Sequence, residues 1–279
     1  MRFTKMQAVG NDFVVVQAIQ EQDWASLARA VCHRHFGVGA DGLLVVSPVT
    51  DADVAMRVFN PDGSEAEACG NGLRCVARYA VERGLVTPRN GELLIATQAG
   101  LRRAKLFTEK GQVAVRVSLG APQFAPRDIP MAVDVPEAGP VLDYPLMAGG
   151  MGLKVACLSM GNPHAVAFPE SPVADFPLAQ VGPAVERHPA FPNRVNFEVV
   201  NIVDQGRAMM RVWERGAGET LGCGSGACAV AVAARLKGLV GNEVQIALPG
   251  GVVMVAWDGR EEVFLTGPAE TVFEGEWIG

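Results

Sequence analysis

Two cysteines, Cys69 and Cys223, occupy the same place in two similar stretches of the chain. Residues 56–86 align without a gap with residues 210–240, and 13 of these 31 positions are identical. In both copies the cysteine is followed by Gly-x-Gly and then by an apolar segment. Backbone N–H groups and the dipole of a helix starting there would lower the pKa of the thiol and bind a carboxylate. A lone thiol is more often a structural residue, but the repeated position indicates a function.

The elements that must position the two thiols follow from the hydrophobic pattern. Apolar strands are predicted over residues 55–59 and 209–213, before each cysteine, and helices over 73–83 and 227–237, after it. Residues 227–234 are apolar on every face, which is typical of a helix buried on all sides. Predicted strands outnumber helices in both halves. The sequence therefore predicts an α+β fold of two pseudo-symmetric domains, each a curved, mostly antiparallel sheet around a central apolar helix.

The domain boundaries follow from a change in composition and from matching ends. A further helix is predicted over residues 24–35, with Asp23 as its N-cap. Proline is concentrated in residues 120–140, the predicted crossing between the halves. The segments that leave the two halves are similar, so the end of the chain is expected to return to the first half. The predicted domains are 1–119 plus 268–279, and 120–267.

Composition excludes several classes of protein. The 279 residues carry a net charge of −6 with scattered Lys and Arg, so neither nucleic acid nor a membrane surface is expected as a partner. The N-terminus lacks the apolar run of a signal peptide and no stretch reads as a transmembrane helix, so a cytoplasmic protein is expected. Cys75 and Cys228 fall inside apolar helical segments and are predicted to be packing residues. The cysteine spacings do not match a zinc knuckle, and no cofactor or metal is expected.

The chemistry suggested by Cys69 and Cys223 is inversion of a stereocentre. If the two related halves face each other, the two thiols lie on opposite sides of one cleft. One thiolate can then remove a proton from a carbon while the opposite thiol returns a proton from behind. The two helix starts would supply N–H donors to the carboxylate of the carbanion.

The sequence resembles the diaminopimelate epimerase family over essentially its full length. The resemblance rests on motifs that occur in the family's order: Lys5-Met6, Gly10-Asn11-Asp12-Phe13, Phe59-Asn60, Asp62-Gly63-Ser64, Ala68-Cys69-Gly70-Asn71-Gly72-Leu73-Arg74-Cys75, Gly161-Asn162-Pro163-His164, Arg194-Val195-Asn196, Glu214-Arg215-Gly216-Ala217-Gly218-Glu219-Thr220, Cys223-Gly224-Ser225-Gly226-Ala227 and Thr266-Gly267-Pro268-Ala269. The resemblance implies a pyridoxal-independent isomerase that interconverts LL- and meso-2,6-diaminopimelate on the route to lysine.

The resemblance also implies a role for each site residue. Cys69 and Cys223 would be the acid/base pair, and His164 and Glu214 would tune the thiols. The substrate would be held by residues from both halves: Asn11, Asn60, Gly70, Asn71, Asn162, Asn196, Glu214, Arg215, Gly224 and Ser225. Phe273 stands where family members have a tyrosine linked to dimerisation, so a homodimer is expected. The chain departs from the family pattern at Gln7-Ala8, where His-Gly is usual, and at Gly42, where many members have a substrate-contacting glutamine.

Two other functions compete with this prediction. A proline or hydroxyproline racemase would share the duplicated fold and the two cysteines. Glu214 and Arg215 argue against it, because a cyclic imino acid has no distal charged end to bind. A redox sensor or binding module could instead use Cys69 and Cys223 to form a reversible disulfide. Such a module would not need the amide side chains that accompany the two thiols.

Overall fold

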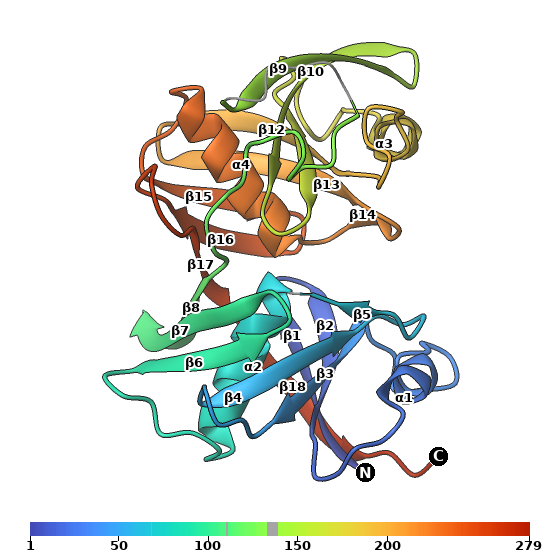
Figure 1. Cartoon of the computed structure of the whole chain (residues 1–279), viewed down its shortest axis with the longest axis vertical. Coiled ribbons are helices and arrows are strands. Elements are labelled where there is room, and N and C mark those ends of the chain that lie inside the picture. The colour runs from blue at the N-terminus through green and yellow to red at the C-terminus, as the bar shows by residue number, and fades with distance from the viewer. Residues whose placement is uncertain (68, 110, 133–138) are drawn as a thin grey trace. The chain divides into compact units, whose positions relative to one another are not determined.

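The computed structural model describes residues 1–67, 69–109, 111–132 and 139–279. Within these ranges the chain forms eighteen strands and four helices (Figure 1). It divides into two compact units, the first made of Met1–Ser118 with Thr266–Gly279 and the second of Leu119–Leu265. The abundance of strands over helices agrees with the α+β fold predicted from the sequence.

The first unit is a single mixed sheet with two helices. Its strands pair in the order β18-β1-β2-β3-β4-β6-β7-β8, and the short β5 pairs with β4. Among the pairs just given, which involve described residues, β2–β3 and β4–β6 are parallel and the others are antiparallel. The elements are β1 (Arg2–Ala8), β2 (Asn11–Gln17), α1 (Trp24–Val31), β3 (Gly42–Ser47), β4 (Val54–Phe59), β5 (Glu65–Ala66), α2 (Gly70–Glu82), β6 (Glu92–Thr97), β7 (Gly100–Glu109), β8 (Gln112–Ser118) and β18 (Glu270–Glu276).

The second unit repeats the order of the first seven of these strands. Its strands pair in the order β9-β10-β11-β12-β13-β15-β16, with the short β14 on β13, and the β11–β12 and β13–β15 pairs are again parallel. The elements are β9 (Val141–Ala148), β10 (Met151–Ser159), β11 (Pro163–Ala167), α3 (Leu178–Glu186), β12 (Asn196–Asp204), β13 (Arg207–Glu214), β14 (Gly218–Thr220), α4 (Gly224–Leu236), β15 (Glu243–Leu248) and β16 (Gly251–Ala256). Strand β17 (Phe264–Pro268) begins in the second unit and ends in the first.

Each sheet curves around the helix that follows its cysteine, as the sequence predicted. Helix α2 contacts seven strands of the first unit, β1 to β4 and β6 to β8. Helix α4 likewise contacts β10, β11, β12, β15 and β16, and every residue of 227–234 is buried (Figure 1). A helix made of alanine, valine and cysteine fits this position because its small side chains allow strands to approach from all sides.

One strand returns to the unit in which the chain begins. Strand β18 ends the chain and pairs with β1 of the first unit, whereas β9, at the equivalent place in the second unit, pairs with the next strand in sequence, β10. Strand β18 thus brings the last part of the chain into the sheet of the first unit.

The sequence prediction differs from the structure at two helices, α3 and α1. Helix α3 was not predicted, because Gly182 and Pro183 interrupt its helical pattern. The predicted helix over residues 24–35 ends earlier, at Val31, but Asp23 does cap it by accepting a hydrogen bond from the Ser26 N–H at 2.9 Å. Residues 133–138 of the proline-rich segment lie outside the described residues.

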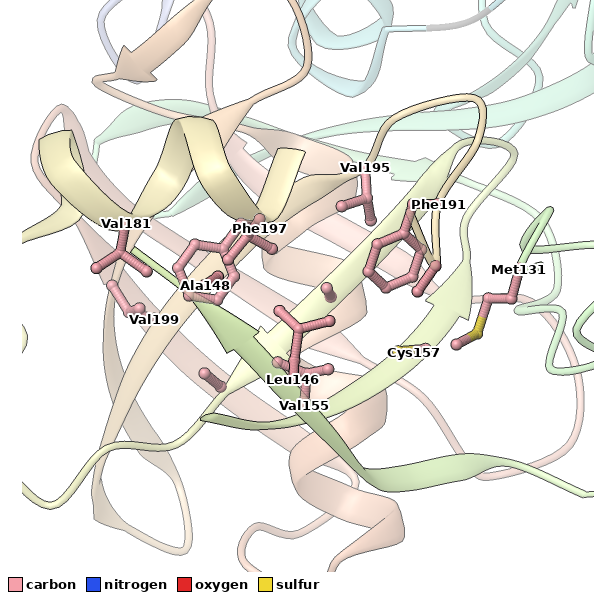
Figure 2. Packing of buried hydrophobic residues seen from close by; sticks show 14 of the residues in the cluster. Met131, Leu146, Ala148, Val155, Cys157, Val181, Phe191, Val195, Phe197 and Val199 are labelled. Atoms are coloured by element: carbon pink, nitrogen blue, oxygen red, sulfur yellow. The ribbon is translucent and has the colours of Figure 1, made fainter. Parts of the chain in front are cut away.

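The core of the second unit explains how this segment is held. Ile129 and Met131, which precede the undescribed residues, are buried and pack against apolar side chains of the sheet. Figure 2 shows Met131 beside Cys157 at one end of this cluster, and Phe197 with Val181 at the other. The proline-rich segment is thus partly a core element of the second unit.

Candidate functional site

Both cysteines of the repeat are N-cap residues of the central helices. Cys69 precedes α2 and Cys223 precedes α4, and both have extended backbone angles. The sulfur of Cys69 accepts a hydrogen bond from the Gly72 N–H at 3.3 Å, and that of Cys223 accepts one from the Gly226 N–H at the same distance. Both helices predicted after the cysteines are present, but they begin three residues earlier than predicted, at Gly70 and Gly224. Each thiol satisfies one of the N–H groups that a helix start leaves unpaired.

Around Cys69, the predicted substrate residues Asn11 and Asn71 lie together. The Asn71 amide donates to Asn11 Oδ1 at 3.3 Å, and Asn11 Nδ2 donates to Asp41 Oδ2 at 2.7 Å. Asp41 also accepts from the Asp12 N–H, so it fixes both the backbone and the amide at the start of β2. This arrangement orients Asn11 with its carbonyl oxygen toward α2.

A fully buried arginine supports the same helix start. Arg74 Nη2 donates to Asn71 Oδ1 at 2.8 Å, and Nη1 donates to the Gly70 carbonyl at 3.3 Å. Arg74 Nε donates to the Pro268 carbonyl at 3.2 Å, which ties α2 to the returning C-terminal segment. The guanidinium thus places a positive charge within one turn of Cys69.

Asn60 lies at the end of β4 and is more exposed than the other predicted residues of this unit. Its side chain donates to Ser64 Oγ at 2.9 Å, and its backbone N–H donates to the Ser64 carbonyl at 2.8 Å. The Asn60 amide is therefore held by a tight turn that leads toward Cys69.

Around Cys223, the neighbours are acidic and hydroxyl groups. Ser225 Oγ lies 3.5 Å from the sulfur. The Glu214 carboxyl, at the end of β13, accepts a hydrogen bond from Thr220 Oγ1 and is hydrogen-bonded to the Cys223 thiol. Burial raises the pKa of Glu214, and the hydrogen bonds from Thr220 and Cys223 lower it in part.

Three hydrogen-bonded polar residues of the same unit are His164 on β11, Glu198 on β12 and the half-buried Asn162, which lies in the turn before β11. His164 Nδ1 is hydrogen-bonded to Glu198 Oε1 at 2.7 Å, and Nε2 to Asn162 Oδ1 at 2.9 Å. The His164 and Glu198 side chains are both 0% exposed. Glu198 also lies directly under the start of α4, because a Cβ placed on Gly226 would be 2.7 Å from Glu198 Oε1.

Asn196 and Arg215 meet beside this chain. Asn196 Nδ2 donates to the Pro163 carbonyl at 2.9 Å, and its Oδ1 accepts from the Arg215 N–H at 2.9 Å. The Arg215 guanidinium is exposed and donates to the Asn193 carbonyl at 3.3 Å. Asn196 therefore fixes the backbone that presents Glu214 and Arg215.

The environment of Cys223 contradicts one expectation. Its side chain is buried, and burial raises its pKa well above the ordinary value. The charges of Glu214 and Glu198 raise it further, while hydrogen bonds from Ser225 and the Gly226 N–H lower it. The prediction that the helix start lowers the thiol pKa is therefore wrong for Cys223, because loss of hydration outweighs the helix dipole.

The predicted site residues fall into two sets, one in each unit. The first unit holds Cys69, Asn11, Asn60, Gly70 and Asn71, and the second holds Cys223, Asn162, His164, Asn196, Glu214, Arg215, Gly224 and Ser225. Phe273 lies on β18 and packs edge-on against Phe3 of β1, with 5.9 Å between the ring centres. Cys75 and Cys228 are fully buried inside α2 and α4, as predicted.

Sequence reasoning missed Asp41, Arg74 and Glu198. Glu198 left a usable signal, because it interrupts the apolar strand β12 at the position where the first half has Leu44. Among the described residues, no three His, Cys, Asp or Glu side chains gather as a metal site would require. Over the same part of the chain, no helix has both the length and the hydrophobicity to cross a membrane.

Sequence comparison places the chain among known proteins. A family model described as diaminopimelate epimerase matches residues 3–125 and 156–272. The diaminopimelate epimerase of Moorella thermoacetica is 48% identical over 282 residues, covering 99% of both chains. That of Methanococcus maripaludis is 42% identical over 280 residues, again covering 99% of both.

Structure comparison finds the same fold in more distant proteins. A PhzF-family phenazine biosynthesis protein of Bacillus anthracis has a TM-score of 0.74 at 18% identity, covering 100% of this chain and 99% of its own. A probable proline racemase of Agrobacterium radiobacter has a TM-score of 0.73 at 18% identity, covering 99% and 92%. These likenesses establish the two-unit fold.

Proposed function

The chain belongs to the diaminopimelate epimerase family, and we propose that it interconverts LL- and meso-2,6-diaminopimelate with Cys69 and Cys223 as the two acid/base groups. The chain is an isomerase of the epimerase class. The observation that carries the mechanism is the equivalence of the two thiols, each the N-cap of a central helix with the same N–H donor three residues on.

The proposed reaction needs one proton donor and one proton acceptor on opposite faces of the α-carbon. One cysteine, as thiolate, takes the α-proton and becomes a thiol. The other, as thiol, gives a proton to the opposite face and becomes a thiolate. The two cysteines thus exchange protonation states in each turnover, and the reverse reaction uses them in the opposite roles.

The reacting end of the substrate would be held by the two helix starts. A helix start presents N–H groups without intrahelical partners, together with the positive end of the helix dipole. The amides of Gly70-Asn71 and Gly224-Ser225 occupy these positions. Donors of this kind stabilise the negative charge that moves onto the α-carboxylate as the carbanion forms.

The distal end of diaminopimelate carries an ammonium and a carboxylate. Glu214 and Arg215 are proposed to pair with them, because a carboxylate suits an ammonium and a guanidinium suits a carboxylate. The amides proposed to complete the binding set are Asn11, Asn60, Asn162 and Asn196. The cyclic substrate of a proline racemase has no distal charged end for Glu214 and Arg215 to bind. The relatives at 42–48% identity are diaminopimelate epimerases.

Three further assignments accompany this function. The enzyme is proposed to need no cofactor, since thiol acid/base chemistry requires none. His164 and Glu214 are proposed to modulate the thiols. The protein is proposed to act in the cytoplasm as a homodimer, with Phe273 in the subunit contact.

Deuterium uptake tests the proposed function. The purified, reduced protein is incubated in D2O with LL-diaminopimelate, and α-deuterium and the meso isomer are followed over time. Cys69→Ala and Cys223→Ala should each lower turnover by about a hundredfold or more, which is the range expected for loss of a general acid or base. Cys75→Ala and Cys228→Ala are the matched controls in the same helices and should remain active. Near-normal turnover in either of the first two variants would refute the two-thiol mechanism.

A further inference from the structure

The two thiols have the same local backbone but different side chains in the strands beneath them. In the first unit Phe13 pairs with Gly42 across β2 and β3, and Leu44 pairs with Val58. In the second unit the same register positions pair His164 with Asn196 and Glu198 with Val212. Glu198 and His164 are thus the structural counterparts of Leu44 and Phe13.

The side chains at these positions touch the helix starts in the same way. A Cβ on Gly72 would lie 3.0 Å from Leu44 Cδ2, and a Cβ on Gly226 would lie 2.7 Å from Glu198 Oε1. Gly72 and Gly226 are the residues whose N–H groups donate to the cysteine sulfurs. The helix start that follows Cys69 therefore packs against a methyl group of Leu44. The helix start that follows Cys223 packs against the carboxylate of Glu198.

Glu198 is held firmly in this place. Its Oε1 is hydrogen-bonded to His164, whose other nitrogen is fixed by Asn162, and neither side chain of the pair is exposed. Glu198 Oε2 is buried without a hydrogen-bond partner among the described residues. Because the Glu198 carboxylate is held in one position, its charge acts on any negative charge that forms on the Cys223 sulfur at the start of α4.

The other polar and charged residues near the two cysteines also differ between the units. The groups that act on the Cys223 thiol are the carboxylates of Glu214 on β13 and Glu198 on β12, together with Ser225 of α4. Thr220 on β14 is hydrogen-bonded to Glu214, and His164 on β11 to Glu198. At the equivalent positions of the first unit, Asn60 replaces Glu214 and Leu44 replaces Glu198, while Arg74 of α2 stands where α4 has Cys228. At these equivalent positions the second unit therefore carries two carboxylates, whereas the first unit carries one guanidinium and no carboxylate.

We propose that Glu198 is a positioning residue that keeps the proton on Cys223 in the free enzyme, so that Cys223 enters the reaction as the proton donor. This inference rests on the two-thiol reaction proposed above. A thiolate at Cys223 would be repelled by the fixed carboxylate of Glu198, whereas a neutral thiol at Cys223 would not be repelled. One turnover leaves Cys69 as a thiol and Cys223 as a thiolate. Glu198 then favours return of the proton from Cys69 to Cys223 before the next turnover.

Alkylation of the individual thiols tests this role without substrate. The intact protein is treated with iodoacetamide over a range of pH, and the rates at Cys223 and Cys69 are read separately by peptide mass spectrometry. In the unsubstituted protein the rate at Cys223 should rise about tenfold per pH unit to beyond pH 9.0, the ordinary thiol value, because the thiol remains protonated. A plateau below that pH would overturn the proposal even if every variant failed to fold.

Substitution of Glu198 should act on one thiol only. Glu198→Gln keeps the shape and removes the charge, so the pH profile of Cys223 should move down by about one unit or more, the usual effect of one nearby charge. The Cys69 profile should not move. Glu198→Asp should restore slow alkylation at Cys223, because it restores the charge. Leu44→Met, at the equivalent place in the first unit, is the control and should change neither profile.

The outcomes separate this proposal from the proposed function. An unshifted Cys223 profile in Glu198→Gln would refute the role of Glu198 while leaving the deuterium experiment untouched. Failure of deuterium uptake would refute the reaction, whatever the alkylation profiles show. Equal shifts at both thiols would also contradict the proposal, because they would indicate a general loosening of the protein.

Discussion

Substitution of Gly226 by alanine tests the close approach of Glu198 to the start of α4. The added methyl group would lie 2.7 Å from Glu198 Oε1, whereas an ordinary contact begins at 3.4 Å. The carboxylate or the helix must therefore shift by about 0.7 Å, the difference of these distances. Because Glu198 Oε1 is hydrogen-bonded to His164 at 2.7 Å and both side chains are buried, the shift strains that bond.

The expected magnitude follows from two opposing terms. Overpacking of this kind costs about 1–3 kcal/mol of unfolding free energy, and weakening a hydrogen bond to a charged group adds to the cost. Replacing glycine by alanine within a helix raises the free energy of unfolding by about 0.5–1 kcal/mol, because alanine has the higher helix preference. Gly226→Ala should therefore lower the free energy of unfolding by about 1–2 kcal/mol net.

Gly72→Ala provides the matched control at the start of α2. Its added methyl group would meet Leu44 Cδ2 at 3.0 Å, a smaller overlap with a flexible apolar group and no hydrogen bond. The unfolding free energy of Gly72→Ala should stay within about 1 kcal/mol of the unsubstituted protein, since the overlap and the helix preference nearly cancel.

Urea unfolding followed by far-ultraviolet circular dichroism measures both variants. Combining Gly226→Ala with Glu198→Ala completes a double-mutant cycle, in which the cost of Gly226→Ala should largely disappear because the carboxylate is absent. If Gly226→Ala is no more destabilising than Gly72→Ala, Glu198 does not lie under α4 and the inference about Cys223 loses its basis.

Two further predictions concern stability at the extremes of pH. Burial raises the pKa of Cys75 to about 12, so its contribution is complete below the ordinary value of 9.0 and is lost as pH rises toward 12. Between pH 8 and 10, the unsubstituted protein should lose about 1 kcal/mol more unfolding free energy than Cys75→Ala, and parallel urea titrations that give equal losses would contradict this. Burial raises the pKa of Asp12, but hydrogen bonds from Arg34 and Lys5 outweigh it and the net value is about 2, so this contribution is present above 3.8 and lost as pH falls toward 2. Asp12→Asn should therefore cost about 2 kcal/mol at pH 7 and little at pH 2, and a cost that is the same at both pH values would argue against the ion pairs.

Much of the fold could be predicted because the relevant signals are local. The two copies around Cys69 and Cys223 share residues at fixed spacings, and glycines next to each cysteine predict a helix start. Asp23 acts as an N-cap through a hydrogen bond three residues away, which a short window of sequence contains. Helix α3 escaped the same reasoning because its own Gly182 and Pro183 obscure the helical pattern, and packing against the sheet decides its form.

The sequence by itself determined the duplication, the placement of each thiol before a helix and the family. Only the tertiary structure decided how the two thiols differ. The pKa of Cys223 depends on burial and on the carboxylates of Glu214 on β13 and Glu198 on β12, which the fold brings to the start of α4. Hydration and charge at a buried atom are set by all neighbours in space, so a local signal such as the helix start predicts only one of several competing contributions. Glu198 is therefore visible in the sequence as a polar residue in an apolar strand, but its position under Cys223 is a property of the fold.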